Sequence, residues 1–310
     1  MKTYVGVTDW DWYRFLQTRG ATEVNFWQPS GGRRFGAISP GAPFLFKSHY
    51  SHGNRIVGAG FLSGWASLPI SGAWEFFGEA NGCASEEDMR RRIQRYRSKD
   101  TAQTSDEVGC IMLRDIRFFE PEDAMAAPPG WASNIVQGRS YESASSEGSY
   151  LEDVLVALLA SHTGDDQPLR VVGDVFGDPR LVPVRVGQRA FKALVQEAYG
   201  RRCAVTGDKI VPVLQAAHIR PVTASGENRV DNGMLLRSDV HTLFDRGYLA
   251  VHPTRKSLLV SPRLRGEWGN GEEFYQRAAS GEAISMPQRR VDQPNQDFLA
   301  WHADTRFLAS

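Results

Sequence analysis

The pattern of apolar and polar positions divides the chain into two halves of different character. In residues 1–140, short apolar runs separated by Gly and Pro turns predict strands, and one amphipathic stretch predicts a helix. The predicted strands are 3–7, 43–47, 55–61 and 109–119, and the predicted helix is 85–98. Short strands with few helices are typical of a small mixed β-barrel.

The second half has helical spacing first and then the order strand, loop, strand, short helix. Ser238 is a suitable N-cap for that short helix, and Gly247 would end it. The other predicted elements are a helix at 188–200, strands at 211–219 and 234–237, and a hairpin made of 248–251 and 257–260.

Composition marks a boundary between the two halves. Residues 141–149 are small and polar, as linkers are, and an amphipathic stretch at 151–160 follows. With 310 residues and 41% hydrophobic content, the chain is long enough to bury two ordinary cores. We therefore expect an α+β protein of two domains, 1–145 and 186–310, joined by a linker with a short helix at 146–185.

Three side chains of the strand-loop-strand-helix segment suit hydrolytic chemistry. His218, Asn232 and His241 follow one another in the spacing His-x13-Asn-x8-His. Such a unit can place a histidine of the first strand opposite one on the helix, with room between them for a divalent ion and a phosphate. One histidine can then deprotonate water while the other holds the ion. The amide of Asn232 can tie down the loop between the strands.

This spacing resembles that of the HNH, or ββα-metal, nucleases. The likeness extends to the Ile-x-Pro after the first histidine, the Asn-Gly before the second strand and the Leu-Phe-Asp-x-Gly at the end of the helix. The resemblance implies that His218 is the general base, that Asn232 braces the loop and that His241 binds the metal ion. It predicts an enzyme that hydrolyses phosphodiesters.

The resemblance also bears on the metal. The family often carries a second ligand four residues after the last histidine, and Asp245 lies there on the same helical face as His241. Its carboxylate could equally pair with Arg246 or Arg237. Many members have a further ligand just before the base, where this chain has Ala217. Sparse ligation with several waters suits Mg²⁺ or Mn²⁺ better than Zn²⁺.

Cysteine usage predicts no structural zinc. The chain has three cysteines, which are too few and too scattered for a four-cysteine site or a disulfide framework. No signal peptide or membrane-spanning run is visible at the N-terminus. We therefore expect a cytoplasmic protein without a membrane partner.

Charge is unevenly distributed along a chain that is neutral as a whole. The segment from residue 180 to residue 265 holds 15 basic and 6 acidic residues, a net charge of +9. A basic segment that coincides with the His-Asn-His spacing is what a phosphate-binding surface requires. The expected backbone contacts flank the motif and are Arg201, Arg202, Arg220, Arg237 and Arg246.

The first half carries a second resemblance. The runs 39–47 and 55–60 look like the central hairpin of PUA-like domains, the superfamily that includes EVE, ASCH, YTH and SRA modules. Several of these families take a modified base out of its helix and hold it by stacking and edge hydrogen bonds. Six of the eight tryptophans precede residue 150, so the material for stacking is present. We expect a base pocket formed by Asp9, Trp10 and Trp27.

Together the two resemblances predict a modification-dependent restriction endonuclease. It would cut double-stranded DNA near a flipped modified base, such as a modified cytosine, and would work as a homodimer because two strands need two catalytic centres. Two other interpretations stay open. One is an HNH restriction or homing-type nuclease that reads unmodified sequence. The other is a non-catalytic nucleic-acid-binding regulator, against which the retention of all three motif residues argues.

Overall fold

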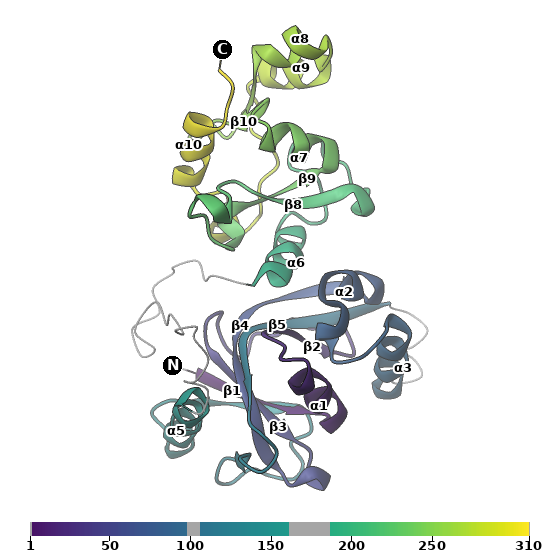
Figure 1. Ribbon diagram of the computed structural model, residues 1–310, viewed down its shortest axis with the longest axis vertical. Helices are drawn as coiled ribbons and strands as arrows, with labels where there is room; N and C mark the ends of the chain where they lie inside the picture. Colours follow the sequence, from purple (N-terminus) through teal and green to yellow (C-terminus); the bar gives the residue numbers. More distant parts are fainter. Residues whose placement is uncertain (1, 98–105, 161–186, 310) are drawn as a thin grey trace. The chain divides into compact units, whose positions relative to one another are not determined.

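The computed structural model describes residues 2–97, 106–160 and 187–309 (Figure 1). The chain divides into two compact units, Met1–Arg180 and Leu181–Ser310. The first is rich in strands and the second combines short strands with helices, so the α+β fold class predicted from the sequence is confirmed. No helix in the described ranges has the length and apolar character needed to cross a membrane.

The first unit is built on one sheet. Its strands are β1 Lys2–Thr8, β2 Glu23–Gln28, β3 Pro43–Ser48, β4 Arg55–Pro69, β5 Glu107–Phe118, β6 Met125–Ala126 and β7 Gly138–Glu142. The order across the sheet is β2-β5-β4-β3-β1-β7, with β6 paired to β4. β1 and β3 are parallel, whereas the other pairs are antiparallel. The four strands predicted from apolar runs are present, and β4 extends eight residues beyond its predicted end.

The sheet is not closed into a barrel, which corrects the barrel expectation. Its path through the described residues ends at β2 on one side and at β7 on the other. β4 is 15 residues long and shifts register twice against β5, between Ala59 and Phe61 and between Leu62 and Gly64. Such irregularities bend a strand and increase its twist, so the sheet curves around a core without its edges meeting.

Helices cover both faces of this sheet. They are α1 Trp10–Thr18, α2 Ile70–Phe77, α3 Glu86–Tyr96 and α5 Ser146–Ala160, with 3₁₀ turns η1 Tyr50–His52 and η2 Gly78–Asn81. Figure 1 shows α1 and α5 on opposite sides of the sheet. α3 matches the helix predicted at 85–98, and its N-cap Ser85 accepts a hydrogen bond from the Asp88 amide. The sequence pattern did not predict α1 or β2. α1 has only nine residues, in which aromatic and charged side chains are mixed.

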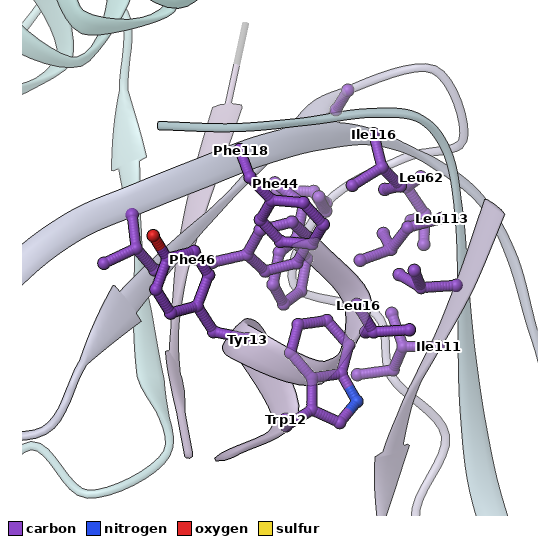
Figure 2. Close-up of a cluster of buried hydrophobic side chains, with 14 of the residues drawn as sticks. Trp12, Tyr13, Leu16, Phe44, Phe46, Leu62, Ile111, Leu113, Ile116 and Phe118 are labelled. Carbon is purple, nitrogen blue, oxygen red and sulfur yellow. The ribbon is translucent and has the colours of Figure 1, made fainter. Parts of the chain in front are cut away.

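The face under α1 is packed with aromatic side chains. Figure 2 shows Trp12 and Tyr13 of α1 against Phe44 and Phe46 of β3, with Phe118 of β5 beside them. The rings of Trp12 and Phe46 are 5.2 Å apart in an edge-to-face arrangement. Since side chains alternate along a strand, residues 44 and 46 share this face. These aromatic side chains are therefore structural.

The opposite face is covered by α5. Leu45, the residue between the two phenylalanines, points this way and clusters with Leu151, Val154 and Leu158 of α5. These three side chains are at most 1% exposed. The helix expected within the linker at 146–185 is thus part of the core of the first unit, which continues beyond residue 145. The rest of that linker, 161–185, lies outside the described residues.

The second unit contains two small antiparallel sheets and several helices. The strands are β8 Leu214–His218, β9 Gly233–Arg237, β10 Leu249–Val251 and β11 Leu258–Val260, paired as β8 with β9 and β10 with β11. The helices are α6 Gln188–Ala198, α7 Ser238–Asp245, α8 Pro262–Trp268, α9 Glu272–Ser280 and α10 Gln296–Thr305. Shorter turns are η3 Val211–Val213, η4 Val222–Ala224, η5 Val230–Asn232 and η6 Arg290–Asp292.

The expected strand, loop, strand and helix are present with small shifts. The first strand begins at Leu214 instead of residue 211, because the preceding residues, which include Pro212, form η3. Ser238 is the first residue of α7 and makes no capping hydrogen bond through its side chain, so its prediction as N-cap was wrong. Gly247 has φ +77°, the left-handed conformation that ends a helix. α6 and α7 both pack on the β8–β9 pair, on opposite sides of it in Figure 1.

Candidate active site

The β8–β9 pair and α7 bring the two motif histidines together. His218 ends β8 opposite Gly233, and His241 lies in the first half of α7. α7 packs against both β8 and β9, and the charge of Asp245 near the end of α7 tends to raise the pKa of the His218 imidazole. The motif thus places one histidine at the end of a strand and the other on the helix that packs against that strand.

His218 is half-buried and held on two sides. Its ring stacks on Phe191 of α6, with centroids 4.1 Å apart and planes 10° apart. Its Nε2 lies 2.9 Å from Oδ1 of Asn228. Burial lowers the pKa of His218 below its usual value, and the hydrogen bond to Asn228 and the charge of Asp245 partly oppose this effect. Burial therefore favours the neutral imidazole, the form that can accept a proton.

Gly233 permits the close approach of α6 to this strand. A Cβ atom at this position would lie 2.9 Å from the ring of Phe191 and 2.5 Å from Val195. Phe191 thus covers the strand backbone at Gly233 while its ring stacks on the neighbouring His218.

Asn232 closes the loop between the two strands. Its side chain is fully buried, and its Nδ2 donates hydrogen bonds of 2.9 Å to the carbonyl oxygens of Arg220 and Glu227. Its Oδ1 accepts a third, also 2.9 Å, from the Arg220 amide. Gly226 lies inside this loop, where a Cβ atom would collide with the Arg220 carbonyl. The loop is consequently compact and tied at both ends by one amide.

His241 and Asp245 form the part of the site that could hold a metal ion. His241 Nδ1 donates to Oε1 of Gln215 at 2.8 Å, which leaves the lone pair on Nε2. That nitrogen lies 3.3 Å from Oδ2 of Asp245. One imidazole nitrogen and one carboxylate oxygen therefore converge, with the histidine ring oriented by a hydrogen bond from its other nitrogen, as is usual for metal ligands.

This donor set fits an oxygen-preferring divalent ion. No cluster of three or more His, Cys, Asp or Glu suited to a metal ion occurs in the described part of the chain. His241 and Asp245 would supply two ligands, and the remaining positions would go to water and phosphate oxygens, as Mg²⁺ and Mn²⁺ tolerate. Asp245 pairs with His241, while Arg237 pairs with Asp208 and Asp239, which removes Arg237 as its alternative partner.

The arginines expected to contact phosphates do not behave alike. Arg237 is bound by Asp208 at 2.6 Å and by Asp239 at 2.7 Å, so its charge is largely compensated. Arg220 donates to the Ala224 carbonyl and lies over the ring of Trp301 at 5.4 Å. The exposed members of the set are Arg202 and Arg246, and Arg201 is half-buried with φ +57°.

Three contacts of this site escaped the sequence analysis. Asn228, Gln215 and Phe191 touch the two motif histidines through hydrogen bonds or stacking. Their only signal is position, since Gln215 lies on the same strand as His218 and Asn228 lies in the following loop. An amide contact depends on how the loop closes, and local residue pattern does not encode that closure.

In the first unit, the residues expected to form a base pocket meet only in part. Both carboxylate oxygens of Asp9 accept from the Tyr96 hydroxyl at 2.8 Å, and His49 Nε2 lies 3.4 Å from Asp9. Burial, together with the hydrogen bond to Asp9, raises the pKa of Tyr96 to about 12. Trp27 lies 6.1 Å from the Tyr96 ring and donates from Nε1 to the Asn81 carbonyl.

Trp10 faces a different neighbour. Its ring stacks on His52 at 5.3 Å with planes 7° apart and meets Tyr13 edge-on. The structure therefore brings Asp9 and Trp27 to Tyr96, a residue that the sequence analysis missed, and turns Trp10 toward η1. Tyr96 is 53% exposed, so this Asp9–Tyr96–Trp27 cluster is open to solvent.

Comparison with known proteins identifies one segment of the second unit. Residues 203–252, which include His218, Asn232, His241 and Asp245, match the family model of an HNH endonuclease. This segment is an HNH endonuclease domain. The HNH domain implies a DNA substrate for the chain and a divalent metal ion as its cofactor. The resemblance inferred from the motif spacing is thus confirmed.

Two solved structures are similar to the chain at low sequence identity. An ASCH protein from Zymomonas mobilis, in a mutant form, has 13% identity and a TM-score of 0.35, covering 51% of this chain and 99% of its own. A structure titled modification-dependent TagI restriction endonuclease has 14% identity and a TM-score of 0.26, covering 91% of this chain and 74% of its own. No curated protein sequence matches the chain.

Proposed function

We propose that this protein is a modification-dependent endonuclease, in which the HNH domain hydrolyses DNA near a base that the first unit recognises. The observation that carries the catalytic part is the pairing of a neutral, rigidly held His218 with the His241–Asp245 pair. A histidine whose neutral form is favoured by burial, together with a two-ligand metal site, is what hydrolysis of a phosphodiester needs.

In the proposed reaction, His218 accepts a proton from a water molecule as the water oxygen attacks the phosphorus. The bond between phosphorus and the 3′ oxygen breaks, and the 3′ oxygen takes up a proton from a solvent water, which leaves a 5′ phosphate and a 3′ hydroxyl. His241 and Asp245 would hold a divalent ion, which when bound would supply charge stabilisation to the leaving oxygen. Asn232 holds the loop that carries the neighbours of His218, and Gln215 orients His241.

Arg202 and Arg246 are the proposed phosphate contacts, because both are exposed within the basic segment. Arg201 and Arg220 would contribute from the same segment, whereas Arg237 would first have to leave its carboxylate partners. Contacts of this kind fix the duplex without reading its sequence. A homodimer would place two centres on the two strands of a double-stranded substrate.

The proposed reader site is the Asp9–Tyr96–Trp27 cluster. A flipped base could stack on an aromatic face there, and the Asp9 carboxylate could accept from an exocyclic amine in exchange for the Tyr96 hydroxyl. Trp10, which stacks on His52, would border this site instead of stacking on the base.

One cleavage assay tests the proposal. Matched DNA duplexes with and without modified cytosine or adenine are incubated with the full chain in Mg²⁺, in Mn²⁺ and in EDTA. We expect cleavage of a modified duplex in a divalent ion and none in EDTA. Equal cutting of modified and unmodified DNA would favour a nuclease that reads ordinary sequence. No cutting of any duplex in either ion would favour a non-catalytic DNA-binding protein.

A further inference from the structure

Asn228 makes a contact that restricts how His218 can carry its proton. It lies in the loop between β8 and β9, and its Oδ1 is 2.9 Å from Nε2 of His218. A carbonyl oxygen only accepts hydrogen bonds, so Nε2 must bear the hydrogen in this contact. In the neutral ring the lone pair then belongs to Nδ1. Asn228 thus selects one of the two tautomers of the imidazole.

The position of Asn228 is itself fixed from its neighbour. Asn232 Nδ2 donates to the carbonyl oxygen of Glu227, the residue directly before Asn228. The same nitrogen donates to the Arg220 carbonyl at the start of the loop. The buried amide of Asn232 therefore sets where the Asn228 side chain can reach.

The ring of His218 is restrained in two independent directions. Stacking on Phe191 fixes the plane of the ring, and the hydrogen bond to Asn228 fixes its rotation within that plane. Either restraint alone would leave one motion open. With both in place, Nδ1 keeps one direction, and a general base needs such alignment with the water that it deprotonates.

We propose that Asn228 is a positioning residue that holds His218 as the Nε2–H tautomer and presents the Nδ1 lone pair as the base. This inference rests on the proposed function of His218 as the proton acceptor. Asn232 then acts indirectly, because it holds the segment that carries Asn228. Loss of the outer hydrogen-bond partner of a metal-bound histidine typically costs about 10–100-fold in activity, and we expect a loss of similar size for a histidine that acts as the base.

The test compares two substitutions of similar size in the full chain. Asn228→Leu removes the acceptor, whereas Asn228→Asp keeps an oxygen within reach of Nε2. We expect Asn228→Leu to lower the single-turnover cleavage rate about 10–100-fold and Asn228→Asp to retain most of it. Thr223→Ala, an exposed change in the same loop, serves as the matched control.

A spectroscopic readout separates positioning from mere loop stability. Nitrogen chemical shifts of ¹⁵N-histidine-labelled protein in EDTA report which ring nitrogen of His218 carries the hydrogen, with His218→Ala used for assignment. We expect the Nε2–H form in the wild type and in Asn228→Asp, and a mixture of tautomers in Asn228→Leu. If the leucine variant fails to fold, Asn228→Ala is measured in the same way.

The outcomes distinguish this inference from the proposed function. A leucine or alanine variant that keeps the Nε2–H tautomer and the parental rate would overturn the role of Asn228. An aspartate variant as slow as the leucine variant would do the same. Cleavage by His218→Ala at the parental rate would instead overturn His218 as the base, and the proposed function with it.

Discussion

His302 lies face to face with Phe244, with ring centroids 3.7 Å apart and planes 6° apart, and its Nε2 donates to the Phe244 carbonyl at 3.1 Å. Phe244 is the residue before Asp245 on α7, and His302 belongs to α10. The C-terminal helix therefore supports the helix that carries both proposed metal ligands. A truncation that removes α10 would be expected to affect the catalytic centre without touching it.

Burial of His302 predicts sensitivity of the second unit to acid. The side chain is 3% exposed, and burial lowers its pKa to about 4. In the unfolded chain a histidine has a pKa near 6.5, so the unfolded state binds the proton at a higher pH than the folded state does. The free energy of unfolding therefore decreases as the pH falls from about 6.5 to about 4. The shift corresponds to at most about 3 kcal/mol. Urea unfolding of the second unit at pH 7 and pH 4.5 measures this loss, and a loss of equal size in His302→Phe would contradict its assignment to His302.

His218→Ala should abolish cleavage while leaving DNA binding nearly intact. The imidazole acts on water and contributes little affinity, and removal of a general base costs about 10²–10⁴-fold in rate. Single-turnover cleavage in Mn²⁺ gives the rate, and fluorescence anisotropy in EDTA gives the affinity. A parallel loss of binding would mean that the substitution disturbs the loop rather than the chemistry.

His241→Ala should lower activity and weaken dependence on the divalent ion together. Its partner Gln215 offers a finer test, because Gln215→Leu removes the acceptor for Nδ1 whereas Gln215→Glu keeps one. We expect the leucine variant to need about 10–100-fold more Mn²⁺ for half-maximal cleavage. Titration of Mn²⁺ against cleavage rate gives the midpoints. Identical midpoints in the wild type and in both His241→Ala and Gln215→Leu would remove His241 from the ligand set.

Trp27 should contribute to preference for modified DNA. In the full chain carrying His218→Ala, which prevents cutting, a modified oligonucleotide should bind more tightly than its unmodified twin. A stacking contact to a base is worth about 1–3 kcal/mol, so Trp27→Leu should remove most of that preference. Trp268→Leu, an exposed tryptophan of the second unit, is the control. Unchanged discrimination in Trp27→Leu would exclude Trp27 from the reader site.

Leu158→Ala tests whether α5 is structural. The side chain is 1% exposed and belongs to the cluster that α5 forms with the sheet. Buried leucine-to-alanine changes cost about 2–5 kcal/mol, so the first unit should unfold at clearly lower urea. Val156→Ala on the same helix, where the side chain is 61% exposed, should change little. Equal and small effects of the two substitutions on the urea midpoint would indicate that α5 is a linker helix and not part of the core.

The catalytic part could be predicted from the sequence because its geometry is local. His218, Asn232 and His241 lie within one strand-loop-strand-helix segment, where spacing nearly determines which side chains face each other. Asn228 could not be found in this way, since its contact depends on the path of a loop that Asn232 closes.

The first unit was harder to predict for a related reason. β1 pairs with β3 and with β7, which lie far from it in the chain, and no local pattern specifies those partners or whether the sheet closes. The helical periodicity of α5 predicted a helix but not the surface that it covers. Its apolar positions are matched by Leu45 on β3, about 100 residues earlier.

Gly233 affects how both Phe191 and His218 are packed. Any side chain at 233 would displace Phe191, and Phe191 is the surface on which His218 lies flat. A substitution at 233 would therefore disturb the alignment of the His218 imidazole, even though residue 233 touches neither water nor DNA in the proposed reaction. A residue larger than glycine at 233 would therefore need a smaller side chain at 191, and that change would remove the ring on which His218 stacks.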